Sequence, residues 1–239
     1  MFRTLSHCSV RATRLVALAA VLSRPVLAQI GTLPERSPFR DVEYNHEWTF
    51  FTGVMANRAD PAGVAPRSGP LVGARYDYHF SGPLFGYVRL TGVASNRVAL
   101  NPGKSGAKRQ VGAFSWPMMF ADMGLETSLT GQKSWHGIMP VASFGLGLYS
   151  DGVSGADVGG FQIGTGFMFS FGGGLRWAPD RRWQLRAEAY NYLYGVDYPA
   201  SYFNAPSGGA GAVLPGSAAR STFRSNYSIQ IGASYTFLR

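Results

Sequence analysis

The final stretch of the chain, residues 227–237, alternates strictly between two kinds of side chain. One parity is apolar or aromatic and the other is polar or glycine: Tyr227, Ile229, Ile231, Ala233, Tyr235 and Phe237 against Ser228, Gln230, Gly232, Ser234 and Thr236. Because successive side chains of a strand point to opposite faces, this pattern predicts a β-strand with one apolar and one polar face. Either a soluble sandwich or a membrane barrel could use such a strand.

The first residues, 1–28, have the layout of a secretory signal peptide. Arginines precede an apolar run from Leu15 to Leu22, and a short stretch of small residues ends at Ala28. Residues 29–45 are rich in proline and charge and are expected to form a periplasmic lead-in. An exported chain whose strands turn polar residues inward is typical of a bacterial outer-membrane barrel.

The composition narrows the choice further. The chain has a formal net charge of +9, and the removal of four arginines with residues 1–28, which hold no acid, leaves +5. These charges are scattered, so we expect no nucleic-acid partner. The only cysteine, Cys8, lies in the predicted signal, so disulfides, thiolate catalysis and cysteine metal sites are not expected. After residue 28 the chain has no apolar run of roughly 20 residues, the length that a spanning helix needs.

Alternation recurs along the rest of the chain and predicts eight strands in total. Their expected ranges are 46–56, 71–80, 84–94, 118–129, 138–149, 162–177, 183–194 and 223–237. The parity of residues 84–94 stays open, because Phe85 and Val93 fall on the same side as Arg89.

The connections between these strands alternate between short and long. The short ones are 81–83, 130–137 and 178–182, and the long ones are 57–70, 95–117, 150–161 and 195–222. Outer-membrane barrels have short periplasmic turns and long extracellular loops. Residues 46–239 are therefore predicted to form an all-β fold, an eight-stranded antiparallel up-and-down transmembrane β-barrel.

Aromatic residues gather near the expected ends of the strands, as in the girdles that flank a membrane-spanning barrel. Those predicted for the periplasmic girdle are Trp48, Tyr78, Phe80, Trp177, Trp183 and Phe237, and those for the outer girdle are Trp116, Tyr149 and Tyr192.

With this layout the chain resembles the small eight-stranded outer-membrane barrels of the opacity and attachment type from Gram-negative bacteria. The resemblance covers residues from about Trp48 onward and includes the closing segment Tyr235-Thr-Phe237, which looks like the aromatic signal read by the barrel-assembly machinery. It implies an outer-membrane location and a role as an adhesin, a stress-induced surface protein or an envelope-stabilising structure. It fixes location better than activity.

Charged residues collect on the parity that faces the barrel interior. The predicted interior charge cluster has four basic and four acidic members: Arg75, Arg89, Arg176 and Arg186 with Asp77, Asp122, Glu126 and Glu188. His79, Gln162, Gln184 and Gln230 share that parity. Eight strands enclose a lumen just wide enough for side chains, so these charges are expected to pair as an internal plug. A proton or ion path along them is the alternative.

The long connection 95–117 is strongly basic and holds no acid. Its cations are Arg97, Lys104, Lys108 and Arg109. They are expected to form either a solvated basic loop or a contact with lipopolysaccharide phosphates or an acidic surface polymer. Together with outer-membrane lipid and the assembly machinery, these are the partners that the sequence suggests.

The sequence therefore predicts a non-enzymatic role in surface interaction or envelope structure through the long loops. A narrow pore for small solutes is one alternative, and a lipid A-modifying enzyme is another. His79 and Ser81 have the spacing of the histidine and serine of lipid A deacylases, but they fall at a predicted periplasmic turn, far from the outer leaflet. A soluble lipocalin-like barrel is an alternative fold, but it would need an apolar cavity where this chain places charges. No cofactor, metal or catalytic residue is predicted.

Overall fold

The structure is a computed structural model that describes residues 37–41, 45–151, 156–180, 182–206 and 211–237. The chain divides into two units, residues 1–37 and 38–239. The predicted signal peptide and most of the predicted lead-in lie outside the described residues. All the elements below belong to the second unit.

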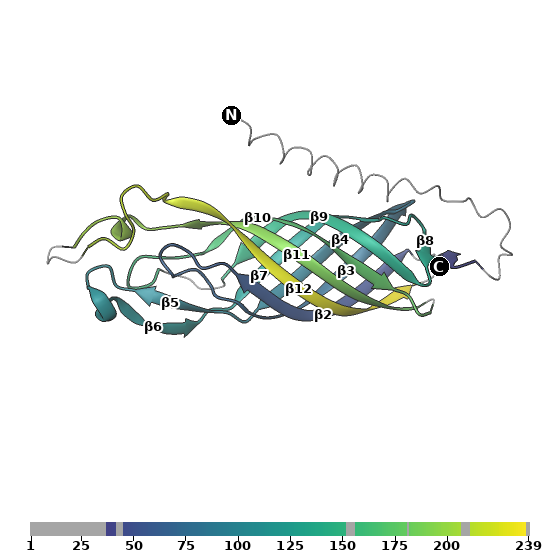
Figure 1. The fold of residues 1–239 in the computed structure, drawn as a ribbon, viewed down its shortest axis with the longest axis horizontal. Coiled ribbons are helices and arrows are strands. Elements are labelled where there is room, and N and C mark those ends of the chain that lie inside the picture. Colours follow the sequence, from purple (N-terminus) through teal and green to yellow (C-terminus); the bar gives the residue numbers. More distant parts are fainter. Residues whose placement is uncertain (1–36, 42–44, 152–155, 181, 207–210, 238–239) are drawn as a thin grey trace, which may run out of the picture. The chain divides into compact units, whose positions relative to one another are not determined.

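Eight long antiparallel strands form a closed barrel (Figure 1). They are β2 (His46–Asn57), β3 (Gly69–Ser81), β4 (Leu84–Val93), β7 (Met118–Ser128), β9 (Ile138–Ser150), β10 (Thr165–Trp177), β11 (Trp183–Asp197) and β12 (Ser221–Phe237). Each strand pairs with the next along the chain, and β12 pairs with β2 to close the ring. The predicted fold class is confirmed.

The two faces of the barrel differ as the alternation predicts. On β12, Ile229 and Ile231 point outward and are 65% and 62% exposed, whereas Ser228 and Gln230 point inward and are buried. On β4 the structure settles the parity that the sequence left open: Phe85 and Val93 are buried with Arg89. The Phe85 ring contacts a cation in the lumen, because the guanidinium carbon of Arg176 lies 5.3 Å from the ring centroid.

The start of β10 differs from the prediction. The strand begins at Thr165 rather than at residue 162, because Gly164 has a left-handed φ of 62° that interrupts extended backbone. Gln162 is therefore exposed and outside the strand, so it does not face the lumen as expected. Ile163 packs against the apolar core instead.

Two connections contain strands that the alternation did not predict. The loop between β4 and β7 folds into a hairpin of β5 (Asn96–Leu100) and β6 (Gln110–Ser115), with a 3-10 turn, η2 (Gly106–Arg109), at its tip. At the opposite end, β1 (Phe39–Asp41) pairs with β8 (Lys133–Trp135), in the turn between β7 and β9. A second 3-10 turn, η3 (Ala200–Tyr202), follows β11. None of the described helices is long and apolar enough to cross a membrane.

The predicted aromatic girdle is present at only one end of the barrel. At the short-turn end, all six predicted aromatics are exposed, from 43% for Tyr78 to 56% for Phe80. The outer girdle prediction was wrong, because Tyr149 and Tyr192 are buried in the lumen and Trp116 is half-buried. Phe167 and Phe223, 72% and 70% exposed, are outward-facing aromatics near the loop end.

Candidate functional site

The contents of the lumen change along the barrel axis. On β11, the residues that point inward run from Gln184 at the short-turn end through Arg186, Glu188, Tyr190, Tyr192 and Tyr194 to Val196 at the loop end. The lumen is therefore charged near the short turns, lined by tyrosines in the middle and apolar under the loops.

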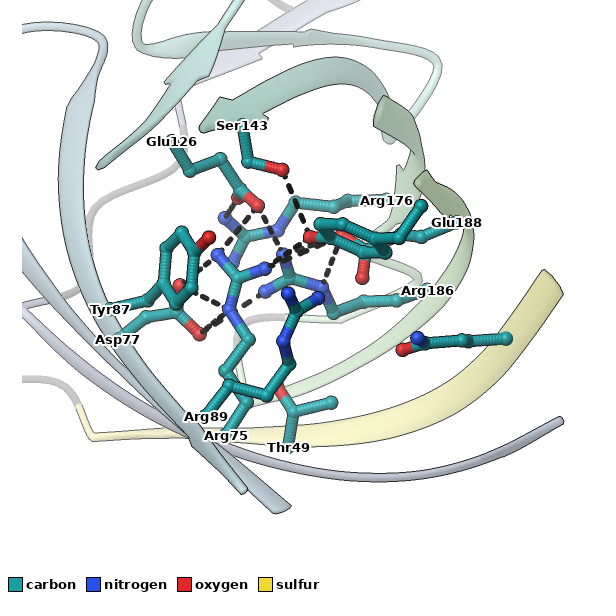
Figure 2. A network of polar contacts seen from close by, with 12 residues as sticks. Thr49, Arg75, Asp77, Tyr87, Arg89, Glu126, Ser143, Arg176, Arg186 and Glu188 are labelled. Carbon is teal, nitrogen blue, oxygen red and sulfur yellow. Dashed lines mark hydrogen bonds and ion pairs between the residues drawn. The ribbon is translucent and has the colours of Figure 1, made fainter. Parts of the chain in front are cut away.

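The charged part, which we call the lumen cluster, combines three arginines with four acids. Its members are Arg75, Arg176, Arg186, Glu47, Asp77, Glu126 and Glu188, and all of them except Glu47 are labelled in Figure 2. They come from β2, β3, β7, β10 and β11, so the cluster exists only in the closed barrel. All seven side chains are at least nine-tenths buried.

Glu126 and Arg186 are the hubs of the lumen cluster. Glu126 accepts from three arginines: its Oε2 lies 2.6 Å from Arg75 Nη2 and 2.5 Å from Arg186 Nη2, and its Oε1 lies 3.0 Å from Arg176 Nη1. Arg186 in turn contacts Glu188 at 2.7 Å and Glu47 at 3.1 Å. A buried charge is tolerated when it is paired and hydrogen-bonded in this way.

Arg75 and Arg176 complete the network. Arg75 Nε and Nη2 both donate to Asp77, at 2.9 and 2.5 Å, and Nη1 donates to the Tyr190 hydroxyl at 2.7 Å. Arg176 also donates to Glu47, and its Nε reaches Gln184 Oε1 at 3.2 Å. The planar guanidinium groups therefore connect carboxylates across the lumen.

A second charged layer lies on the loop side of the lumen cluster. Arg89 binds Asp122 through two hydrogen bonds, Nε to Oδ1 at 3.0 Å and Nη2 to Oδ2 at 2.6 Å. Its guanidinium carbon lies 3.9 Å from the ring centroid of Tyr190, so the cation also contacts an aromatic face. Ser170 donates to Asp122 at 2.7 Å.

Inward glycines make room for these large side chains. A Cβ at Gly145 would lie 2.3 Å from the Tyr87 hydroxyl and 2.8 Å from Ser170 Oγ. Glycine at this position therefore lets Tyr87 reach across the lumen. This agrees with a packing role for the inward glycines.

The structure places all eight predicted interior charges in the buried lumen. It adds one that sequence reasoning missed, Glu47, which is fully buried and bound to Arg176 and Arg186. Lumen acids therefore outnumber lumen arginines by one among the described residues. The parity of Glu47, opposite the outward Trp48, could have revealed it.

The long loops pack together as an ordered cap on the barrel. We use the word cap for the described parts of residues 58–68, 94–117, 151–164 and 198–220. Its core is apolar and buried: Val64, Val98, Leu100, Phe161, Tyr202 and Leu214. These side chains join the apolar cluster that continues into the lumen through Phe120 and Met168.

Polar contacts within the cap use most of its acids. Asp157 accepts from Arg97 Nη1 at 2.8 Å, and Asp151 accepts from Trp116 Nε1 at 3.0 Å. Burial raises the pKa of Tyr198, and the carboxylate of Asp60 raises it further. Tyr198 therefore stays protonated and donates to Asp60 Oδ2 at 3.0 Å. These contacts tie one loop to another.

The four predicted basic loop residues have different surroundings. Arg97 is not solvated as expected: it is 1% exposed, paired with Asp157, and stacked 3.9 Å above the Trp116 ring. Arg109 is half-buried and donates to the backbone oxygens of residues 104, 211 and 212. Lys104 and Lys108 are exposed. Arg97 and Arg109 therefore connect the β5–β6 hairpin to other loops of the cap.

His79 and Ser81 lie at the short turn between β3 and β4, as the sequence indicated. His79 Nε2 is 2.9 Å from the Gly82 oxygen, and its ring contacts Phe85 at a centroid distance of 4.9 Å. The pocket that His79 lines has a volume of about 10 Å³, roughly the space for one water. An acyl chain does not fit in this space.

The filled lumen predicts that the barrel does not conduct along its axis. In planar bilayers the purified protein should give no steady ionic conductance, because paired side chains fill a lumen of this strand number. Single-channel recording checks this. Reproducible open-channel steps would contradict a closed lumen and favour the pore alternative.

No protein-family model matches the chain, and no curated protein sequence matches it. Among solved structures, the outer membrane protein OprG from Pseudomonas aeruginosa is 12% identical with a TM-score of 0.47, covering 83% of this chain and 99% of its own. The outer membrane protein AlkL, determined in lipid bilayers, is 14% identical with a TM-score of 0.43, covering 88% and 98%. The Yersinia pestis outer membrane protein Ail, determined in a nanodisc, is 14% identical with a TM-score of 0.37, covering 82% and 100%.

Proposed function

We propose that this protein is an integral barrel of the bacterial outer membrane that acts without catalysis and binds anionic surface polymers through its cap. The observation that carries the proposal is a contrast between lumen and cap. In the lumen, arginines and acids pair with one another. On the cap, exposed cations outnumber exposed acids: Arg58, Arg67, Lys104, Lys108 and Arg220, whereas Asp60, Asp151 and Asp157 are engaged in internal hydrogen bonds.

The outer face of the barrel supports a membrane location. Large apolar side chains such as Val54, Phe171 and Ile231 point away from the lumen and are 57%, 43% and 62% exposed. A soluble protein rarely leaves so continuous an apolar surface to water, whereas lipid covers it without cost. The exposed aromatics at the short-turn end suit the headgroup region.

Two observations favour the cap over the lumen as the working part. The lumen is filled with paired side chains, so it offers no obvious path for a solute. The cap is instead tied together by contacts between loops, and a scaffold that holds its loops in place presents them at low entropic cost on binding. An envelope-structural role through lipopolysaccharide phosphates uses the same exposed cations.

Binding to a matched pair of polymers tests the proposal. The barrel, refolded in phosphatidylcholine nanodiscs, should bind dextran sulfate and not uncharged dextran of the same length. The affinity should fall with added salt, because exposed charges are screened within about 10 Å at 0.1 M ionic strength. Equal binding to both polymers, or binding to neither, would overturn the proposal.

A further inference from the structure

The loop between β2 and β3 lines a pocket of its own. The pocket has a volume of about 450 Å³, and one continuous segment, residues 57–68, forms its lining. Its wall includes two arginines, Arg58 and Arg67, and one acid, Asp60. A volume of this size is in the range of small-molecule sites.

The backbone around this pocket is held in place. Asn57 Nδ2 closes the neck of the loop by donating to the Pro66 oxygen at 2.9 Å. Asp60 Oδ1 accepts from the Ala65 amide at 2.9 Å inside the loop. Val64, fully buried in the cap core, anchors the segment from below. A ligand would therefore meet a preformed pocket rather than order a free loop.

The charge of the pocket is positive. Arg58 and Arg67 are exposed, and neither forms an ion pair within the described residues. A third guanidinium lies beside this segment, because Arg224 Nη2 donates to the backbone oxygens of residues 58 and 59 at 2.5 and 2.6 Å. The one acid, Asp60, is occupied by amides and by Tyr198. The guanidinium groups of Arg58 and Arg67, which form no ion pair within the described residues, suit phosphate or sulfate oxygens.

We propose that the pocket of residues 57–68 binds a phosphorylated or sulfated sugar, with Arg58 and Arg67 on the acidic ester. The inference rests on the proposed function and names the place on the cap where the anionic polymer is held. The sugar could belong to lipopolysaccharide of the same membrane or to a free polymer, since both carry the same chemistry.

Two double variants with equal charge loss test the site. In phosphatidylcholine nanodiscs, Arg58→Gln/Arg67→Gln should weaken dextran sulfate binding by about tenfold or more, the equivalent of one charge-assisted hydrogen bond. Lys104→Gln/Lys108→Gln, the control on another loop, should weaken it by less than about threefold, as for screened surface charges. Equal losses would overturn the pocket and leave the proposed function standing. No binding by the unchanged protein would overturn both.

A pair of tryptophan variants tests the cavity without changing charge. Ala59 lines the pocket and is exposed, and Ala107 is exposed on the β5–β6 hairpin. Ala59→Trp should abolish saturable binding of glucose 6-phosphate, whereas Ala107→Trp should leave it unchanged. Both variants should keep the heat-dependent gel mobility of a folded barrel. Undiminished binding by folded Ala59→Trp would contradict the proposal.

The membrane composition then separates the two sources of the sugar. If lipopolysaccharide occupies the pocket, glucose 6-phosphate should bind in phosphatidylcholine nanodiscs and be excluded when lipopolysaccharide is included. Binding that persists in both membranes assigns the pocket to a free polymer. If glucose 6-phosphate bound in neither membrane, the sugar site would be overturned.

Discussion

Replacing Glu126 by alanine should lower the free energy of unfolding of the refolded barrel by about 3–5 kcal/mol. This carboxylate accepts hydrogen bonds from Arg75, Arg176 and Arg186, all within 3.0 Å. Removing it leaves buried guanidinium groups without their shared acceptor, and an uncompensated buried charge is costly. Urea unfolding from lipid vesicles, followed by tryptophan fluorescence, measures the change.

A matched acid outside the lumen provides the control. Asp197 lies at the loop end of β11 and is exposed, so Asp197→Ala should change stability by less than about 0.5 kcal/mol. A similar loss for both variants would show that Glu126 is not held in a buried network. A gain in stability with Glu126→Ala would contradict the pairing itself.

The second large effect concerns the lipid-facing surface. Phe171 is the central residue of β10 and points outward, so Phe171→Arg places a charge near the middle of the membrane. The barrel should lose about 2–4 kcal/mol of stability, the cost of an arginine at the bilayer midplane. The same vesicle unfolding titration measures it.

Phe167 provides a control on the same strand and the same face. It lies two residues after the start of β10, near the loop end, so Phe167→Arg should cost only about 0–1 kcal/mol. The difference between the two variants reports depth in the membrane. If Phe167→Arg proved the more costly of the two, the placement of the strand across the membrane would be wrong.

Much of the barrel could be predicted because its signal is local. Alternation along a strand gives the facing of each side chain, and the lengths of the connections give the order of turns and loops. The eight strands and the inward parity of residues such as Arg75 and Glu126 follow from these two patterns. Boundaries were less certain, since the left-handed Gly164 shortens β10 without disturbing the alternation.

The partners within the lumen could not be predicted, because parity gives the face of a side chain but not its height along the barrel. Glu126 meets Arg186, 60 residues away, only through the stagger of closed strands. The cap was also beyond the sequence patterns. In the sequence Arg97 belongs to a basic loop, and only the fold brings Asp157 and the Trp116 ring to it. Contacts of this range depend on tertiary packing and leave no periodic signal.

The sidedness of the cap is the most direct test of an outer-membrane barrel that works at the cell surface. Single cysteines can report it, because Cys8 is the only cysteine of the chain and can be replaced by serine. Ser105 is exposed in the cap, and Gln132 is exposed in the short turn between β7 and β9. With a membrane-impermeant maleimide, Ser105→Cys should be labelled on intact cells and Gln132→Cys only after the outer membrane is broken. Labelling of Gln132→Cys alone on intact cells would invert the topology, place the cap in the periplasm and contradict the account.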